Sequence, residues 1–110
     1  MLERDITTKI LRYLKTVPKC FCWKQHGGQF GTAGIPDIIA CFRGMFVAFE
    51  VKNTNGRLSK LQEVTLGRIS EAGGRAFVVR SLDDVLSALE SMEVVNEYSV
   101  GVSGQESGYD

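Results

Sequence analysis

Three ionisable residues, Asp37, Glu50 and Lys52, lie in or beside two apolar segments of strand length. Arg43-Gly44 separates the segments and favours a two-residue hairpin loop. In that hairpin Asp37 lies directly opposite Glu50, with Cβ atoms roughly 4.5–5.5 Å apart. Two carboxylates at this distance repel each other unless a cation or a proton joins them. Lys52 follows Glu50 by two residues and points to the same face of the sheet. The spacing therefore predicts a metal site beside a lysine ammonium group.

The predicted ligands are the carboxylates of Asp37 and Glu50 and the backbone carbonyl of Val51. These hard oxygen donors suit Mg²⁺ or Mn²⁺ far better than zinc. Such a site retains waters on the cation, and one of them can attack phosphorus after losing a proton. Lys52 can orient or deprotonate that water or neutralise charge in the transition state. Gln62, one turn into the next predicted helix, can hold the water or a phosphate by hydrogen bond.

The rest of the chain predicts the elements that position these residues. Apolar periodicity and turn signals predict a helix over 2–16, a strand over 20–25, the hairpin strands up to 42 and over 45–52, a helix over 59–72, a strand over 75–80, and a helix from Ser81. Ser59 and Gln62 form a capping-box pattern, and Gly73-Gly74 ends that helix. The strand–helix–strand order predicts that strands 45–52 and 75–80 are parallel. Both faces of the hairpin are apolar, so we predict a three-layer α/β/α domain with a mixed central sheet.

The composition changes near Glu93. Residues 1–92 are predicted to form one domain, and residues 93–110 an acidic tail rich in Gly and Ser. This composition is typical of a disordered tail, but Val94, Tyr98 and Val102 leave open a strand or an arm that docks on a partner subunit.

Charge is unevenly distributed although the whole chain has a formal net charge of zero. Residues 1–90 contain all 13 Lys and Arg residues and 9 acidic ones, giving +4, whereas residues 91–110 carry −4. This asymmetry permits a polyanionic partner. No apolar run reaches the ~18–20 residues that cross a bilayer, so we expect no membrane segment and a cytoplasmic location.

The three cysteines are expected to be reduced thiols. Zinc binding by Cys20, Cys22 and His26 is the alternative, but their spacing is not usual for a structural zinc site. The glycine-rich segment from His26 to Gly34 matches neither a dinucleotide-binding nor a phosphate-binding loop. Its glycines fit a loop in which backbone approaches a ligand or covers a cleft.

Pro36-Asp37, a hairpin and Glu50-Val51-Lys52 resemble the PD-(D/E)XK nuclease pattern. Further matches indicate the VRR-NUC subfamily in particular: Gly34-Ile35-Pro36-Asp37, Gly56, Leu58-Ser59, Gln62, Gly73 and Val78-Val79-Arg80-Ser81. Val78-Val79-Arg80 is similar to the Val-Arg-Arg signature of that family, with Ser81 in place of the second arginine. The resemblance covers about residues 2–90. It implies a restriction-endonuclease-like core and a divalent-metal-dependent DNA nuclease.

The resemblance also implies an active-site acid on the first helix, and Glu3 is the matching residue. From its position alone, Glu3 is equally well a first-turn acid that interacts with the helix dipole. The chain is similar to the short stand-alone members of the family. This similarity implies a homodimer that cuts branched DNA such as Holliday junctions. A two-fold dimer presents two sites to a junction of matching symmetry.

Candidates for DNA contacts are the polar and basic residues near the predicted site, namely Lys24, Gln25, His26, Arg57, Lys60 and Arg80. Each cation taken singly also fits a solvated surface charge, and His26 a solvated loop residue. Three alternatives remain: a flap or general DNA nuclease of the same fold, a non-catalytic nucleic-acid-binding module, and a buried ion network of Asp37, Glu50 and Lys52 with a structural role.

Overall fold

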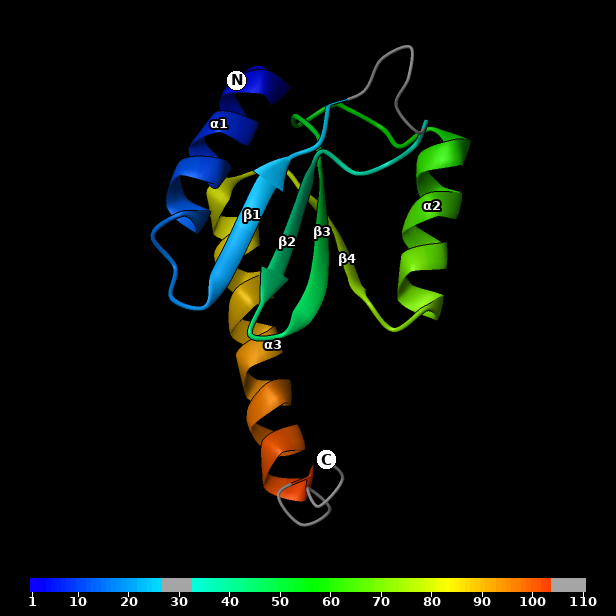
Figure 1. Cartoon of the computed structure of the whole chain (residues 1–110). Coiled ribbons are helices and arrows are strands. Elements are labelled where there is room, and N and C mark those ends of the chain that lie inside the picture. Colours follow the sequence, from blue (N-terminus) through cyan, green and yellow to red (C-terminus); the bar gives the residue numbers. More distant parts are fainter. Residues whose placement is uncertain (27–32, 104–110) are drawn as a thin grey trace.

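A computed structural model describes the backbone of residues 1–26 and 33–103 and the side chains of residues 1–26 and 33–93. The elements follow one another in the predicted order (Figure 1): α1 (Glu3–Leu14), β1 (Cys20–Lys24), β2 (Ile38–Phe42), β3 (Met45–Val51), α2 (Lys60–Glu71), β4 (Arg75–Val79) and α3 (Leu82–Ser103). The predicted glycine-rich segment falls largely on residues 27–32, outside the described residues.

The four strands form one mixed sheet in the order β1-β2-β3-β4. β1, β2 and β3 are antiparallel neighbours, and β4 is parallel to β3, as the strand–helix–strand order predicts. Ile38 pairs with Phe49, the register that the two-residue hairpin loop requires. Arg43 and Gly44 have φ angles of 53° and 84°, and two positive φ values are typical of the type I′ turns that match strand twist.

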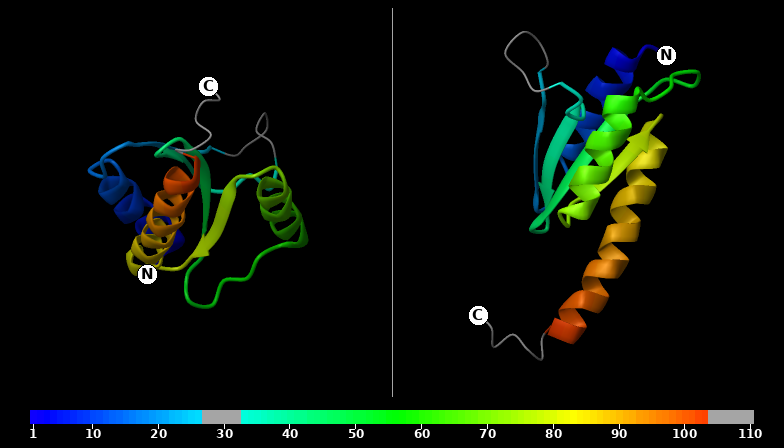
Figure 2. Two further views of the ribbon diagram at one scale, coloured as in Figure 1. Left: turned by 90° about the horizontal axis from the view of Figure 1, so that it is seen from below. Right: turned by 90° about the vertical axis from the view of Figure 1, so that its right-hand side faces the viewer.

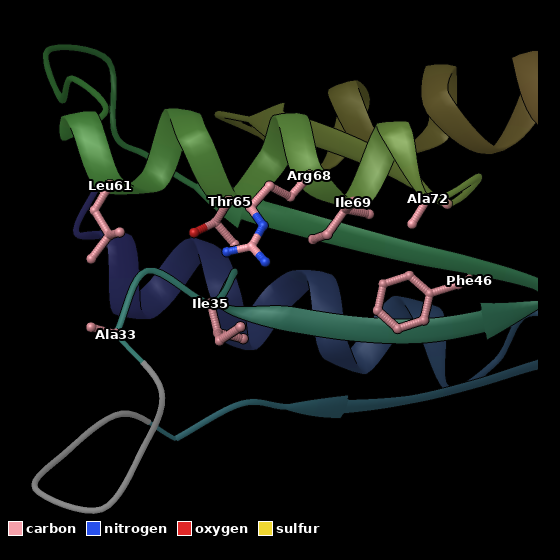
Figure 3. A pocket seen from close by; sticks show the side chains of 9 residues that line it. Ala33, Ile35, Phe46, Leu61, Thr65, Arg68, Ile69 and Ala72 are labelled. Atoms are coloured by element: carbon pink, nitrogen blue, oxygen red, sulfur yellow. The ribbon is translucent and has the colours of Figure 1, made fainter.

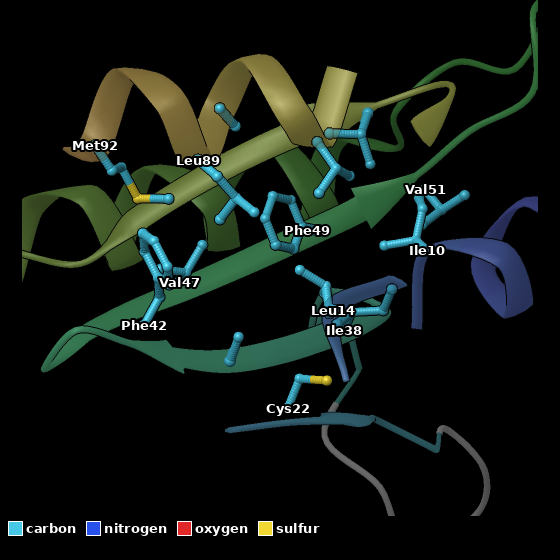
Figure 4. Packing of buried hydrophobic residues seen from close by; sticks show 14 of the residues in the cluster. Ile10, Leu14, Cys22, Ile38, Phe42, Val47, Phe49, Val51, Leu89 and Met92 are labelled. Carbon is cyan, nitrogen blue, oxygen red and sulfur yellow. The ribbon is translucent and has the colours of Figure 1, made fainter. Parts of the chain in front are cut away.

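Helices α1 and α3 cover one face of the sheet and α2 lies on the opposite side (Figure 2). The core lies on the α1 and α3 side (Figure 4), where Phe42 and Phe49 of the hairpin pack with Ile10 of α1 and with Val85 and Met92 of α3. Burying a side chain of this size contributes roughly 1.5–3 kcal/mol. This single core holds β2 and β3, the strands that lead to Asp37 and Glu50.

The α2 side of the sheet is only partly covered. Helix α2 has no buried residue, and its 12 residues lie against β4 rather than β1. Phe21 of β1 remains 71% exposed and Phe46 of β3 48% exposed, and Cys41 of β2 is exposed as well. The predicted three-layer architecture is therefore confirmed, and part of the α2 side stays exposed because one short helix cannot span four strands.

Both ends of α2 follow the predicted signals. Ser59 Oγ accepts a hydrogen bond from Gln62 N (3.1 Å), and Ser59 N donates to Gln62 Oε1 (2.9 Å), which completes the capping box. After the helix, Gly73 has a φ of +99° and Gly74 N donates to Ile69 O (3.0 Å).

Helix α3 continues past Glu93, where the composition predicts that the domain ends. Met92 is buried, and Glu93 Oε2 lies 3.8 Å from Arg43 Nη2 at the hairpin turn. For residues 93–110 the sequence leaves open a disordered tail, a strand or an arm. The structure is helical as far as Ser103, and residues 104–110 lie outside the described residues. Helix α3 projects beyond the sheet (Figure 1). Across the described part of the chain, no helix combines the length and apolar character needed to cross a membrane.

Candidate active site

Asp37 directly precedes β2 and faces the end of β3. Its Oδ2 atom accepts a hydrogen bond from Val51 N (2.7 Å). This bond continues the β2–β3 ladder, with a side chain in place of a backbone carbonyl. Because the N–H and C=O of one strand residue point to the same side, the Val51 carbonyl also points toward Asp37. The side chain of Val51 faces away from the site and into the core.

Glu50 is the buried acid of the site, with 3% of its surface exposed. Burial, followed by the charge of Asp37 and a hydrogen bond with it, raises the pKa of Glu50 to about 8, and Lys52 acts in the opposite direction. Glu3 makes a smaller contribution that also raises this pKa. Without a cation, Glu50 is therefore mainly a neutral acid at pH 7.

Lys52 completes the predicted trio. Its Nζ atom lies 3.9 Å from Glu50 Oε2, and its side chain is 12% exposed. This distance is at the upper limit for an ion pair, and the raised pKa of Glu50 means that the pair is fully charged only when Glu50 ionises. The Lys52 ammonium group therefore lies beside a carboxyl group whose raised pKa favours the neutral form.

The donor set fits a hard divalent cation. Burial, followed by the Asp37 carboxylate, raises the pKa of Glu50, and a cation between the two acids would counteract both effects. Their carboxylates and the Val51 carbonyl are the oxygen donors that Mg²⁺ or Mn²⁺ prefers. Within the described residues, no group of three or more His, Cys, Asp or Glu side chains is arranged to hold a metal. A cation here would depend on two carboxylates, one carbonyl and water.

Gln62 comes from the first turn of α2, on the other side of Glu50. Its Nε2 atom donates to Glu50 Oε2 (3.1 Å), while its Oε1 accepts from Ser59 N in the capping box. The cap therefore fixes which end of the amide faces Glu50. In this arrangement Gln62 orients Glu50, whereas the sequence predicts that it holds water or phosphate.

Glu3 reaches the site from the opposite layer, at the N-terminal end of α1. Its Oε2 atom accepts a hydrogen bond from Asn53 N (3.4 Å), one residue after Lys52. Gly56 is close as well, because a Cβ atom built on it would lie 3.0 Å from Glu3 Oε2. The structure thus brings Glu3 together with the predicted trio, through the loop that follows β3.

The candidate DNA contacts lie at different distances from this centre. Gln25 is the most closely connected, because Gln25 N donates to Asp37 O (2.8 Å) and its Oε1 accepts from Trp23 Nε1 (3.2 Å). Lys24, His26 and Arg57 are exposed. Lys60 is exposed too, and its Nζ lies 4.0 Å from Glu63 Oε1.

The loop of residues 53–56, which begins with Asn53, was not predicted as part of the site. Asn53 Oδ1 accepts from Asn55 N (3.2 Å), and Asn53 O accepts from Gly56 N (3.1 Å). Arg80, one of the DNA-contact candidates and part of the Val78-Val79-Arg80 match, also contacts this loop. The Asn-x-Asn-Gly turn signal could have found the loop, but no local signal connects it with Arg80.

A groove of about 600 Å³ runs between α2 and the sheet (Figure 3). Its lining is mostly apolar, from Ile35 before β2, Phe46 of β3, and Leu61 and Ile69 of α2, with Arg68 at its side. Gly34, in the segment before β2, lies close to α2, since a Cβ atom built on it would lie 2.7 Å from Leu61 Cγ.

Two solved structures share this fold. One, described as a VRR_NUC domain, is 23% identical, has a TM-score of 0.58, and the match covers 80% of this chain and 90% of the other. The second, a VRR_NUC domain protein, is 17% identical with a TM-score of 0.63, and covers 82% and 86%. The chain has the VRR_NUC fold. The predicted restriction-endonuclease-like core is thereby confirmed. No family model and no curated protein matches the sequence.

Proposed function

We propose that this chain is a divalent-metal-dependent DNA nuclease of the VRR-NUC family that hydrolyses phosphodiester bonds in branched DNA such as Holliday junctions. The observation that carries the proposal is the position of Glu50, a buried acid between Asp37, Lys52 and Gln62. The two VRR_NUC structures with the same fold support the nuclease assignment. The net charge of +4 on residues 1–90 supports a polyanionic substrate.

In the proposed reaction, Asp37, Glu50 and the Val51 carbonyl would hold Mg²⁺ or Mn²⁺. When bound, the cation stabilises charge on the phosphate oxygens and makes a water more acidic. Lys52 orients that water or neutralises developing charge, since its ammonium group is within 3.9 Å of Glu50. Gln62 keeps Glu50 directed toward Asp37, and Glu3 lies at the edge of the site near Asn53.

Cleavage of defined DNA substrates tests this proposal. End-labelled four-way junctions, flaps and linear duplexes of matched sequence are incubated with the purified chain in Mg²⁺, Mn²⁺ or EDTA. We expect cutting that requires the metal and is fastest on the junction. Asp37→Asn should abolish cutting, whereas Asp5→Asn, which removes an exposed acid of α1, should leave it unchanged. Folded protein that binds DNA without cutting any substrate would identify a non-catalytic binding module instead.

A homodimer acting in the cytoplasm completes the proposal. The exposed apolar side chains on the α2 side, among them Phe21, Phe46 and Leu61, provide surface that a second copy can bury. Two copies related by a two-fold axis would bring two sites to one branched substrate.

A further inference from the structure

Arg80 connects two parts of the chain that are far apart in sequence. Its Nη1 atom donates to Asn53 O (2.5 Å) and to Gly56 O (2.9 Å), across 27 and 24 residues. Both carbonyls belong to the loop of residues 53–56, called the site loop below, which directly follows Lys52. One guanidinium nitrogen therefore holds the first and the last residue of the site loop.

The backbone of Arg80 is itself fixed. Arg80 N donates to Asp84 Oδ2 (2.8 Å) in the first turn of α3, and Asp84 N donates in turn to Ser81 Oγ (3.3 Å). The preceding residue, Val79, is 1% exposed and accepts a hydrogen bond from Lys52 N (3.0 Å). The arginine side chain thus extends from a backbone position that the core and α3 both hold.

On its other side, the site loop contacts Glu3. Asn53 N donates to Glu3 Oε2 (3.4 Å), and the Cβ position of Gly56 lies 3.0 Å from the same oxygen and 3.3 Å from Lys52 Cδ. A shift of the site loop would therefore move the backbone N–H that bonds to the Glu3 carboxylate, and would change the space around the Lys52 side chain.

We propose that Arg80 is a positioning residue of the candidate active site, which clamps the site loop through two backbone carbonyls and so sets the positions of Glu3 and Lys52. The inference rests on the proposed nuclease function for its catalytic consequence, but the clamp itself is a property of the metal-free fold. The proposed role of Arg80 differs from a direct phosphate contact, because its guanidinium group donates hydrogen bonds to protein carbonyls. Hydrogen bonds from a charged donor are stronger than those between neutral groups, which suits a cation at this position.

The first experiment measures the clamp without any catalysis. Hydrogen exchange of residues 53–58 is followed in the metal-free full-length protein for the wild type, Arg80→Gln, Arg80→Lys and Arg75→Gln. Arg75 is an exposed arginine at the other end of β4 and serves as the matched control. We expect exchange in Arg80→Gln to be faster by about tenfold or more, with Arg80→Lys intermediate and the control unchanged. Unchanged exchange in a folded Arg80→Gln protein would overturn the clamp.

The second experiment measures the consequence for the reaction on a junction substrate. In Arg80→Gln we expect kcat to fall about 10- to 100-fold, as for other losses of positioning, while KM and the salt dependence of DNA binding stay close to wild type. Adding Glu3→Gln to Arg80→Gln should reduce kcat by less than the product of the two single effects. A raised KM with a shallower salt dependence and unchanged kcat would identify a phosphate contact and overturn the proposal.

The two experiments separate this inference from the proposed function. If the wild type cuts no substrate, the nuclease proposal and the catalytic consequence of Arg80 both fail, and the exchange measurement still decides whether Arg80 holds the site loop. If the wild type cuts and Arg80→Gln cuts equally well, the nuclease proposal stands and the positioning role fails. Should Arg80→Gln not fold, Arg80→Lys provides the same comparison with the charge retained.

Discussion

Glu50 has the most perturbed environment among the candidate site residues. It is 3% exposed, faces the Asp37 carboxylate, and has its pKa raised to about 8. Buried acids with a raised pKa are typical of functional sites. Such an acid needs a compensating charge, for example a bound cation, in order to ionise. The residue therefore gives the stability of the metal-free protein a dependence on pH.

The stability of the metal-free protein should fall as the pH rises from about 5 to about 8. Glu50 holds its proton more tightly in the folded state than in the unfolded chain, so its contribution is complete below the unfolded pKa of about 4.5 and is lost as the pH passes the folded value of about 8. Urea midpoints in EDTA across this range measure the effect. Glu50→Gln should remove this component of the slope. An unchanged slope in that variant would mean that Glu50 ionises normally.

Lys52→Met should reduce cutting by at least about 10²-fold, because the change removes the ammonium group next to the metal ligands. The free energy of unfolding should change by no more than about 1 kcal/mol, since the apolar stem is retained and Glu50 is mainly neutral at pH 7. Junction cleavage and urea unfolding measure the two effects, and Lys60→Met, which changes an exposed lysine, is the control. Strong destabilisation with residual cutting would instead support a structural ion network.

Much of this centre was predictable at the residue scale. The pairing of Asp37 with Glu50 follows from the length of the hairpin loop alone, because one register places them opposite each other. The contacts of Gln62 and Arg80 were not predictable in the same way. They depend on how α2 and the end of β4 approach the sheet, which is decided by tertiary packing, and no short-range pattern encodes that approach.

Among the elements, α2 contributes to the site although it is weakly packed. It supplies Gln62 to Glu50, yet none of its residues is buried. The helix lies close to Gly34. A Cβ atom built on Gly34 would lie 2.7 Å from Leu61 Cγ and 2.8 Å from Thr65 Oγ1. A side chain at residue 34 would push the helix away from the sheet, and Gln62 away from Glu50.

Gly34→Ala should therefore be more harmful than Gly44→Ala. Both glycines have positive φ values, +81° and +84°, so both substitutions carry a backbone cost of about 1 kcal/mol. Only Gly34 has neighbouring atoms within 4 Å of the new Cβ. We expect Gly34→Ala to lower the free energy of unfolding by about 1–3 kcal/mol more than Gly44→Ala, as overpacking does, and to reduce cutting as well. Urea unfolding and junction cleavage compare the two, and equal effects would contradict the role of the close contact.

Element types were well predicted because their signals are local. Apolar periodicity, the Ser59 cap and the Gly73 end all act within a few residues. The C-terminal end of α3 was not, since Gly, Ser and acidic residues favour disorder by composition. Met92 and Glu93 anchor the helix to the core and to Arg43, and the helix continues from that anchor to Ser103. Whether residues 93–110 act as an arm on a partner subunit stays a prediction.

For the whole molecule, the exposed apolar groups on the α2 side lead us to expect a homodimer. Light scattering coupled to size exclusion should give about twice the 12.1 kDa of one chain. Phe46→Ser, which replaces a 48% exposed aromatic residue beside the groove, should shift the protein toward the monomer, whereas Leu86→Ser, at a 39% exposed position on α3, should not. A monomeric wild type at micromolar concentration would contradict the dimer.

Trp23 gives the molecule an optical reporter. It is the single tryptophan of the chain, 43% exposed, and its indole bonds to Gln25, whose backbone N–H bonds to Asp37 O. Because all tryptophan emission comes from this one position, whose partner Gln25 also bonds to the backbone of Asp37, DNA that occupies the site should change its intensity or wavelength without any label. The cleavage-deficient Lys52→Met protein would let binding be titrated apart from cutting, and Trp23→Phe would remove the signal. The exposed indole of Trp23 should thus make occupancy of the site observable by fluorescence.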